Sequence, residues 1–225
     1  MEELLKATID TAVKTKAIRP AEFERVIVDT TVQEKAIAHP VDSRLLEIAR
    51  AKVVQAAKRV GIALKQTFVQ EGKELRREAG GYAHAKQFKR LRRTVKRQRT
   101  ILGIVLREIG CKLASATCES PGTIAHLNTL LERAERIRTQ QPKDKNKLYA
   151  LHAPEVECIG KGKARKPYEF GVKASIAVTH KSGLMVGART FPGNPYDGHI
   201  LSAQLEQTNI PVSYTHLTLP TSDLV

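Results

Sequence analysis

The chain has 225 residues, enough for one or two domains with a hydrophobic core. Its 38 Lys and Arg residues against 23 Asp and Glu give a net charge of +15, which predicts a polyanionic partner, most simply nucleic acid. Aromatic residues make up 4% and Trp is absent, so stacking on single-stranded bases is not the expected mode of binding.

Membrane association is not expected, because no apolar run reaches the length of a spanning helix and no signal peptide opens the chain. The three cysteines show no paired metal spacing and are read as reduced thiols. The predicted location is therefore the cytoplasm, in association with the nucleoid.

The first predicted elements are a helix over residues 2–18, ending before Pro20, and a strand over residues 25–32. The strand reads RVIVDTTV, so three β-branched residues lead directly to Asp29. A strand holds such a carboxylate on rigid backbone, as several metal nucleases do for their first Mg²⁺ ligand. An Asp in this position is also a common turn former or helix cap, and the pattern alone leaves both interpretations open.

Helices are predicted to follow. The first is capped by Asp42 or Ser43 and closes at Gly61. Residues 62–82 are less regular, with a break at Gly80–Gly81. A long helix over residues 83–109 and another beginning near Pro121 carry matching apolar seams, which predict an antiparallel helical hairpin.

Positive charge gathers at the start of the long helix. Residues 86–99 contain no acid and eight basic residues, namely Lys86, Lys89, Arg90, Arg92, Arg93, Lys96, Arg97 and Arg99. A solvated coiled-coil face usually mixes charges of both signs, so contact with DNA phosphates is the favoured interpretation. For a second basic run, a DNA contact and an ordinary solvated loop both stay open; its members are Lys161, Lys163, Arg165 and Lys166.

The remaining pattern predicts a β-hairpin and a helix. Apolar and polar residues alternate over residues 168–179, a turn follows, and residues 184–191 return as a second strand. Asp197 can cap the helix after it. The order of elements is therefore that of an α/β fold: a partial ribonuclease-H-like sheet of three strands and one helix, interrupted by a helical-hairpin insertion.

Two blocks, Val26–Leu46 and Lys147–Leu201, resemble bacterial insertion-sequence transposases of the DDE type, nearest the insertion-sequence-five family. The blocks include VIVDTTV and GNPYD, and the resemblance extends over residues 1–210. It implies a homo-oligomeric enzyme that cleaves and joins the ends of double-stranded transposon DNA with Mg²⁺ or Mn²⁺ held by three carboxylates. By position, Asp29 matches the first of these acids.

The chain departs from the family pattern beyond that acid. The second acid normally lies in an Asp-(Arg/Lys)-Gly-Tyr motif and the third is a Glu on a later helix, and both are absent. Asp197 matches a recurring family Asp, for which a helix cap is favoured over a metal ligand. The chain is thus expected to be an inactive transposase fragment; the alternative is a nonenzymatic, basic helical DNA-binding protein.

The expected organisation follows from these assignments. Residues 1–23 end an N-terminal helical region, residues 24–40 hold the first core strand with its acid, residues 41–146 are the insertion, and residues 147–210 complete the core. The last part, residues 211–225, includes PVSYTHLTLPT, which matches one reading frame of a common transposon-end sequencing adapter. This tail is expected to be non-native.

Overall fold

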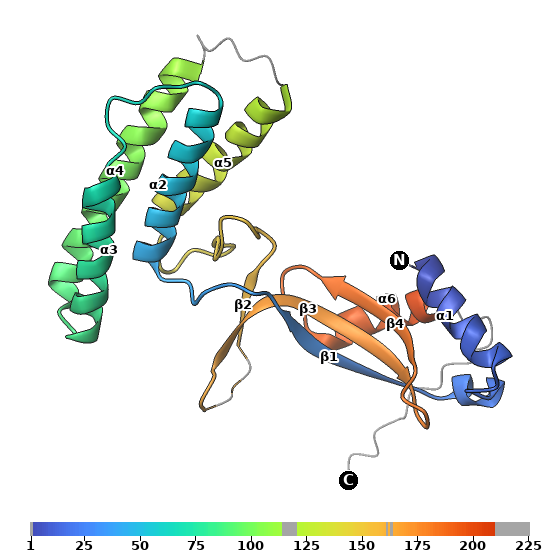
Figure 1. Cartoon of the computed structure of the whole chain (residues 1–225). Coiled ribbons are helices and arrows are strands. Elements are labelled where there is room, and N and C mark those ends of the chain that lie inside the picture. Colours follow the sequence, from blue (N-terminus) through green and yellow to red (C-terminus); the bar gives the residue numbers. More distant parts are fainter. Residues whose placement is uncertain (1, 114–120, 161, 163, 210–225) are drawn as a thin grey trace. The chain divides into compact units, whose positions relative to one another are not determined.

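A computed structural model describes residues 2–113, 121–160, 162 and 164–209, so the predicted adapter-derived tail lies outside the described residues. The chain forms two compact units (Figure 1). We call residues 36–156 the helical unit, and residues 1–35 together with 157–225 the sheet unit. The chain thus leaves the sheet unit after its first strand and returns to it 121 residues later.

The sheet unit is built around a central strand, β3 (Tyr168–Thr179). Strand β1 (Val26–Glu34) pairs with it antiparallel along one edge. Two strands share its other edge. Strand β4 (Met185–Phe191) pairs antiparallel with residues 173–178 of β3, and strand β2 (Glu157–Gly160) pairs antiparallel with residues 168–171. Gly171 is opposite Glu157 of β2 and also opposite Glu34 of β1. The predicted antiparallel sheet of three strands is confirmed, whereas the four residues of β2 are too few for an alternation that the sequence would reveal.

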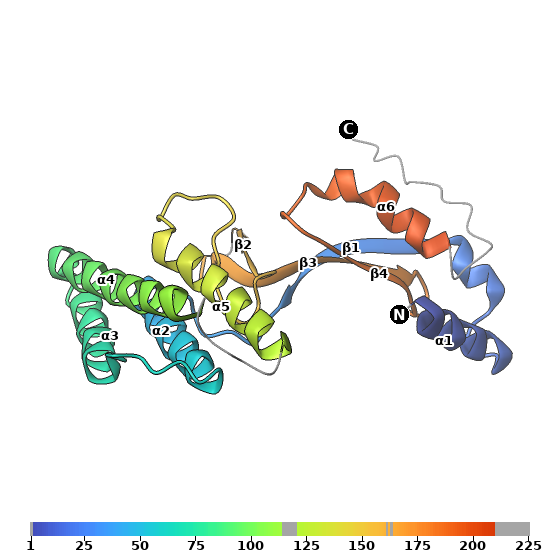
Figure 2. The ribbon, with the colours of Figure 1, turned by 90° about the horizontal axis from the view of Figure 1, so that it is seen from above.

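Helix α6 (Asp197–Asn209) packs on one face of this sheet (Figure 2). The contact is close because Gly187 of β4 has no side chain. A Cβ atom there would lie 2.6 Å from Thr208 Oγ1 and 2.8 Å from Gln204 Nε2. Both polar side chains are fully buried. Helix α1 (Glu2–Lys14) adds Ile9 to a small hydrophobic cluster with Ala177 and Val186, and the 3₁₀ helix η1 (Pro20–Glu24) adds Phe23.

The helical unit contains α2 (Asp42–Arg59), α3 (Val69–His84), α4 (Phe88–Leu113) and α5 (Pro121–Thr139). Its core is formed by apolar residues at helical spacing on three of these helices, with Leu46, Ala49 and Val53 from α2, Leu102, Val105 and Ile109 from α4, and Leu127, Ala134 and Ile137 from α5. None of the described helices is both long and apolar enough to span a bilayer.

Helices α4 and α5 form the predicted antiparallel hairpin. Gly103 of α4 lies beside Arg138 near the end of α5, with 3.4 Å between the position of a Cβ atom and Arg138 Cδ. Gln98, which the sequence placed in the apolar seam, is buried, and its Nε2 donates to the Ser43 carbonyl at 3.3 Å. From Gln98 to Ile109 the seam of α4 therefore faces its neighbours as the pattern predicts, whereas Phe88 at its start is exposed.

Three predictions for the helical unit are wrong. Helix α3 runs through Gly80 and Gly81, where a break was expected, because packing against α4 outweighs the low helix propensity of glycine. The long helix begins at Phe88, five residues later than predicted, since residues 85–87 form the turn between α3 and α4. Neither Asp42 nor Ser43 caps α2; its N-cap is Val41, which makes no side-chain capping bond.

Strand β3 can approach β1 closely only because position 171 is a glycine. A Cβ atom at Gly171 would lie 2.1 Å from the Gln33 carbonyl oxygen, far inside van der Waals contact. We expect Gly171→Ala to lower the free energy of unfolding of the sheet unit by about 2 kcal/mol or more, measured by urea denaturation. Gly160→Ala in β2 is the control, because a Cβ atom there meets nothing within 4 Å. Equal stability of the two variants would contradict this account of the β1–β3 contact.

Candidate nucleic-acid interface and the position of Asp29

The positive charge of the chain is concentrated in the helical unit. Residues 36–156 contain 25 Lys and Arg against 11 Asp and Glu, whereas the rest of the chain contains 13 against 12. The helical unit therefore carries +14 of the net charge of +15. A polyanion attracted by this chain would be attracted to the helical unit, while the sheet unit is close to neutral.

The basic residues predicted to contact DNA lie on α4 and on the turn before it. Lys86 precedes the helix in a left-handed conformation, with φ of 55°. Lys86, Lys89 and Arg93 are exposed, and no partner for them is found among the described residues. The same holds for Arg92 and Lys96. Five of the eight predicted cations are thus available to an external anion.

The other three cations have partners within the helical unit. Arg97 forms a bidentate ion pair with Glu71 of α3, with Nε–Oε1 at 2.6 Å and Nη2–Oε2 at 3.1 Å, and this bond raises the pKa of Arg97 above its ordinary value. The guanidinium of Arg90 lies over the Tyr82 ring, 5.9 Å from its centroid. These pairs join α3 to α4, so part of the predicted DNA-binding set holds these two helices together.

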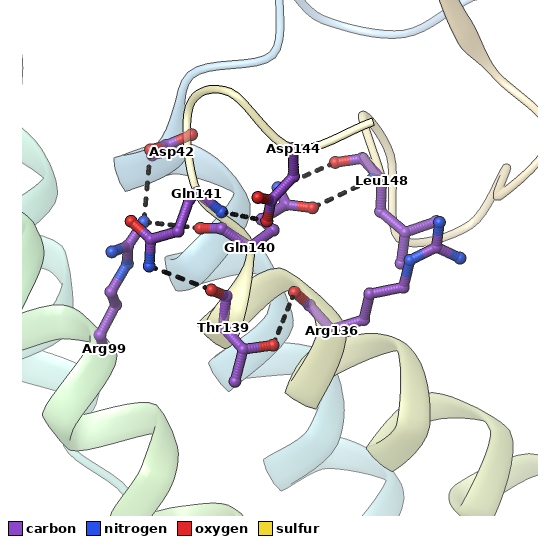
Figure 3. A network of polar contacts seen from close by, with 8 residues as sticks. All are labelled: Asp42, Arg99, Arg136, Thr139, Gln140, Gln141, Asp144 and Leu148. Carbon is purple, nitrogen blue, oxygen red and sulfur yellow. Dashed lines mark hydrogen bonds and ion pairs between the residues drawn. The ribbon is translucent and has the colours of Figure 1, made fainter. Parts of the chain in front are cut away.

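Arg99 takes part in a polar network at the carboxyl end of α5 (Figure 3). Its Nη2 donates to the Gln140 carbonyl at 3.0 Å and lies 3.6 Å from Asp42 Oδ2 at the start of α2. The side chain of Gln140 is buried and bonds Leu148 in both directions: Nε2 donates to the Leu148 carbonyl at 3.2 Å, and Oε1 accepts from the Leu148 N–H at 3.0 Å. The network connects α2, α4 and the segment after α5.

The second predicted basic run belongs to the sheet unit. Lys161 and Lys163 lie outside the described residues. Arg165 is exposed. Lys166 is exposed as well and forms an ion pair with Glu34 of β1, and this hydrogen bond raises the pKa of Lys166. The charge of Lys166 is therefore partly balanced by the Glu34 carboxylate at the end of β1.

Asp29 lies in the middle of β1 and not at its end, because the strand continues to Glu34. Its side chain is exposed, and Oδ1 accepts a hydrogen bond from the Thr30 N–H at 2.8 Å. Its neighbour Val28 is opposite Ala177, which is in turn opposite Gly187 under α6. Successive side chains of a strand point to opposite faces, so Asp29 lies on the sheet face away from α6.

Asp197 lies on the other side of the sheet. It is the first residue of α6, and its Oδ1 forms an ion pair with Lys173 Nζ at 2.5 Å. Lys173 is on the same face of β3 as Ala177. The structure thus does not bring Asp29 and Asp197 together, and it pairs Asp197 with Lys173 at the start of α6.

A metal site of the kind that the family resemblance implies is not completed by the described residues. No group of three or more His, Cys, Asp or Glu side chains able to hold a metal ion is found in this part of the chain. Asp29 contributes a single carboxylate on an open sheet face. A two-metal site needs several carboxylates around both ions, so Mg²⁺ or Mn²⁺ would require ligands in addition to Asp29.

The sequence analysis missed two basic residues that the fold places near α4. Arg44 of α2 and Arg76 of α3 line the same cavity as Arg92 and Lys96, and its volume is about 960 Å³. They stand outside the run of residues 86–99 and are isolated in the sequence. The spacing of Arg76, Ala79, Gly80 and Ala83 is that of one face of a helix, and this pattern could have predicted that Arg76 lies beside a surface of small residues.

Comparison with known proteins gives one relative of limited extent. A protein of Rhizobium meliloti, described as the uncharacterized protein ORF8 in the nfe locus, is 51% identical over 88 residues. The match covers 39% of this chain and 42% of that protein, so the chain spans less than half of its relative's length. No family model matches the chain, and no solved structure matches it.

The Gln140 network makes a prediction about stability. Replacing Gln140 by Leu would leave the N–H and the carbonyl of Leu148 without their side-chain partners in a buried place. We expect the free energy of unfolding of the helical unit to fall by about 1–3 kcal/mol, measured by urea denaturation followed by circular dichroism. Gln141→Leu is the control, because Gln141 is exposed and its side chain donates only to the Thr139 carbonyl. A Gln140 variant as stable as the control would contradict the role given to this network.

Proposed function

We propose that this chain is the DNA-gripping part of a transposase of the DDE type, with Asp29 as its first catalytic acid. The observation that carries the proposal is the concentration of charge: +14 of the net charge lies in the helical unit, and five cations on α4 and the turn before it have no partner among the described residues. Lys and Arg side chains that neutralise phosphates supply sequence-independent affinity for double-stranded DNA. The helical unit would hold DNA, and the sheet unit would present the acid.

The order of elements in the sheet unit supports the enzymatic half of the proposal. Strands β1, β3 and β4 are antiparallel neighbours in the order β1–β3–β4, and helix α6 follows β4 and packs on the sheet. A ribonuclease-H-like core opens in this way, with its first metal-binding acid on the first strand, and the helical unit stands where an insertion after that strand would stand. In the complete enzyme, Mg²⁺ or Mn²⁺ would bind Asp29 and further acids, and the protein would act as a homo-oligomer at the nucleoid.

A nonenzymatic DNA-binding protein is the second candidate, and one observation favours it. Among the described residues, Asp29 belongs to no group of three or more His, Cys, Asp or Glu side chains that could hold a metal ion. A carboxylate on an open strand can simply be a solvent-exposed residue of an antiparallel sheet. The two candidates agree on DNA binding by the helical unit and differ on the role of Asp29.

The DNA-binding proposal is tested by removing three exposed cations, on α4 and the turn before it, that do not line the cavity of about 960 Å³. We expect the triple variant Lys86→Gln, Lys89→Gln, Arg93→Gln to bind unrelated duplexes more weakly by similar factors. The slope of log K against the logarithm of the salt concentration should become less steep by roughly 0.9 for each phosphate that the variant no longer neutralises. Fluorescence anisotropy at several salt concentrations measures both quantities, and Gln preserves helix propensity.

A second triple variant with the same change of charge is the matched control. Lys52→Gln, Lys58→Gln and Arg59→Gln remove three exposed cations of α2, in the same unit but outside the proposed interface. The control should keep nearly the affinity and the salt slope of the wild type. If both triple variants behave alike, DNA responds only to net charge and the α4 interface is refuted.

The role of Asp29 is tested separately. The chain is expected to bind plasmid DNA without nicking it in Mg²⁺ or Mn²⁺, because one carboxylate does not hold two metal ions. In a protein that also carries the second and third acids, Asp29→Asn should abolish cleavage and leave DNA binding intact. Gel electrophoresis of supercoiled plasmid measures cleavage. Full cleavage by the Asn variant would refute the catalytic role and favour the nonenzymatic candidate.

A further inference from the structure

The apolar stripe of α4 extends further than the helix that covers it. Leu102, Val105 and Ile109 are fully buried in the core shared with α2 and α5. Helix α2 begins at Asp42, and its first turn lies beside Gln98, whose Nε2 donates to the Ser43 carbonyl. The next apolar positions toward the start of α4, Leu91 and Val95, are only half-buried and line a cavity beside the first turn of α2.

Leu91 and Val95 line a groove between α3 and α4. Helix α3 contributes Ala79, Gly80 and Ala83 to the same floor, and the cavity volume is about 960 Å³. A Cβ atom at Gly80 would meet nothing within 4 Å, so the floor is open at this position. Small residues opposite larger apolar ones allow a helix to lie close against both walls, at the 8–10 Å typical of packed helices. The groove thus prolongs the site that α2 occupies on α4.

The rim of the groove is basic. Three helices contribute its cations, which are Arg44, Arg76, Arg92, Lys96 and Arg99. The acid among the described lining residues is Asp42, and it already pairs with Arg99. No side chain caps the amino end of α2 at Val41, so the positive end of its helix dipole adds to the rim. The groove therefore presents an apolar floor under a positive border.

We propose that the α3–α4 groove binds an amphipathic helix of another polypeptide, with apolar residues at helical spacing and acidic residues on both sides of that stripe. Such a helix would continue the packing of α2 on α4 and place its carboxylates at the basic rim. Charge complementarity across this border determines the partner's acidic character. The chain's own α1 does not serve as this helix, because its Ile9 is already buried in the sheet unit.

Nucleic acid fits the groove less well than a protein helix. The floor consists of aliphatic side chains and glycine, and no aromatic ring lines it on which a base could stack. A phosphate backbone makes no favourable contact with such a floor. This inference does not rest on the DNA-binding proposal, since the cations tested there, Lys86, Lys89 and Arg93, do not line the groove.

The test uses the whole chain and a fluorescein-labelled peptide of eighteen residues, with Leu at positions i, i+3, i+4 and i+7 and Glu on the flanks of this stripe. Anisotropy should report saturable binding. Gly80→Gln fills the floor and Arg76→Glu reverses the rim, and each should weaken binding by about tenfold, the equivalent of 1.4 kcal/mol. Gln has a higher helix propensity than Gly, so the first variant should stay folded.

Arg77→Glu is the matched control, because it makes the same change of charge at the next position of α3 without lining the groove. It should change peptide affinity by less than about twofold. A peptide of the same composition with a scrambled sequence should bind at least about tenfold more weakly. Circular dichroism and thermal unfolding verify that each variant is folded.

Three results would overturn the proposal. Equal binding of the scrambled peptide would mean that acidic charge alone is recognised. A folded Gly80→Gln variant with unchanged affinity would mean that the floor is not occupied. Displacement of the peptide by duplex DNA, with both ligands weakened alike by Gly80→Gln and Arg76→Glu, would mean that the groove is a nucleic-acid surface. None of these results bears on the triple variant of α4, so the two proposals fail or stand separately.

Discussion

The arrangement of the helical unit depends on one buried ion pair. Arg50 Nε and Nη2 donate to both carboxylate oxygens of Glu47, at 2.9 and 2.7 Å, and both side chains are more than nine-tenths buried. Arg50 Nη1 also donates to the Thr67 carbonyl at 2.6 Å, just before α3. Burying two charges is costly unless they are paired and hydrogen-bonded, and here each charge is. Gly72 of α3 lies directly on the pair, where a Cβ atom would be 2.3 Å from Glu47 Oε2.

This contact has consequences for both proposed interfaces. It holds the first half of α3 against α2, and the turn at residues 85–87 then returns the chain as α4, antiparallel to α3. The cations of α4 that have no partner among the described residues and the floor of the groove are thereby placed on one pair of antiparallel helices, α3 and α4. Because the fold fixes the backbone of both helices, a partner would order the side chains alone, and this lowers the entropic cost of binding.

The acids of the helical unit are used mainly inside it. Glu71 pairs with Arg97, Asp42 with Arg99 and Glu108 with Lys112. Each pair connects neighbouring turns or helices, and none neutralises Lys86, Lys89 or Arg93. Concentrated like charge destabilises a folded protein through self-repulsion, and an anionic partner, as proposed above, would relieve this repulsion. The charge of the sheet unit is nearly balanced, and its described residues form no comparable basic surface. The functional candidate in this unit is the exposed carboxylate of Asp29.

The sequence by itself determined the elements that have a clear period. Alternation over residues 168–179 and the apolar run before Asp29 predicted the sheet, because side chains of a strand with one covered face alternate in polarity. The seam of α4 and its basic character were predicted for the same reason, from spacing within one helix. The four-residue strand β2 and the passage of α3 through Gly80 and Gly81 were not, because they depend on pairing with β3 and on packing against α4.

Only the tertiary structure decided which residues meet. Five of the eight cations of residues 86–99 have no partner among the described residues. Arg97 and Arg99 bind acids, because other helices bring Glu71 and Asp42 to them. Arg44 and Arg76 join the groove although they are distant in the chain. Asp29 and Asp197, both acids of the family-like blocks, are separated by the sheet itself, since the register of β1 on β3 sets the face of each side chain. A local pattern specifies the face of an element, whereas the partner of that face is set by contacts between distant segments.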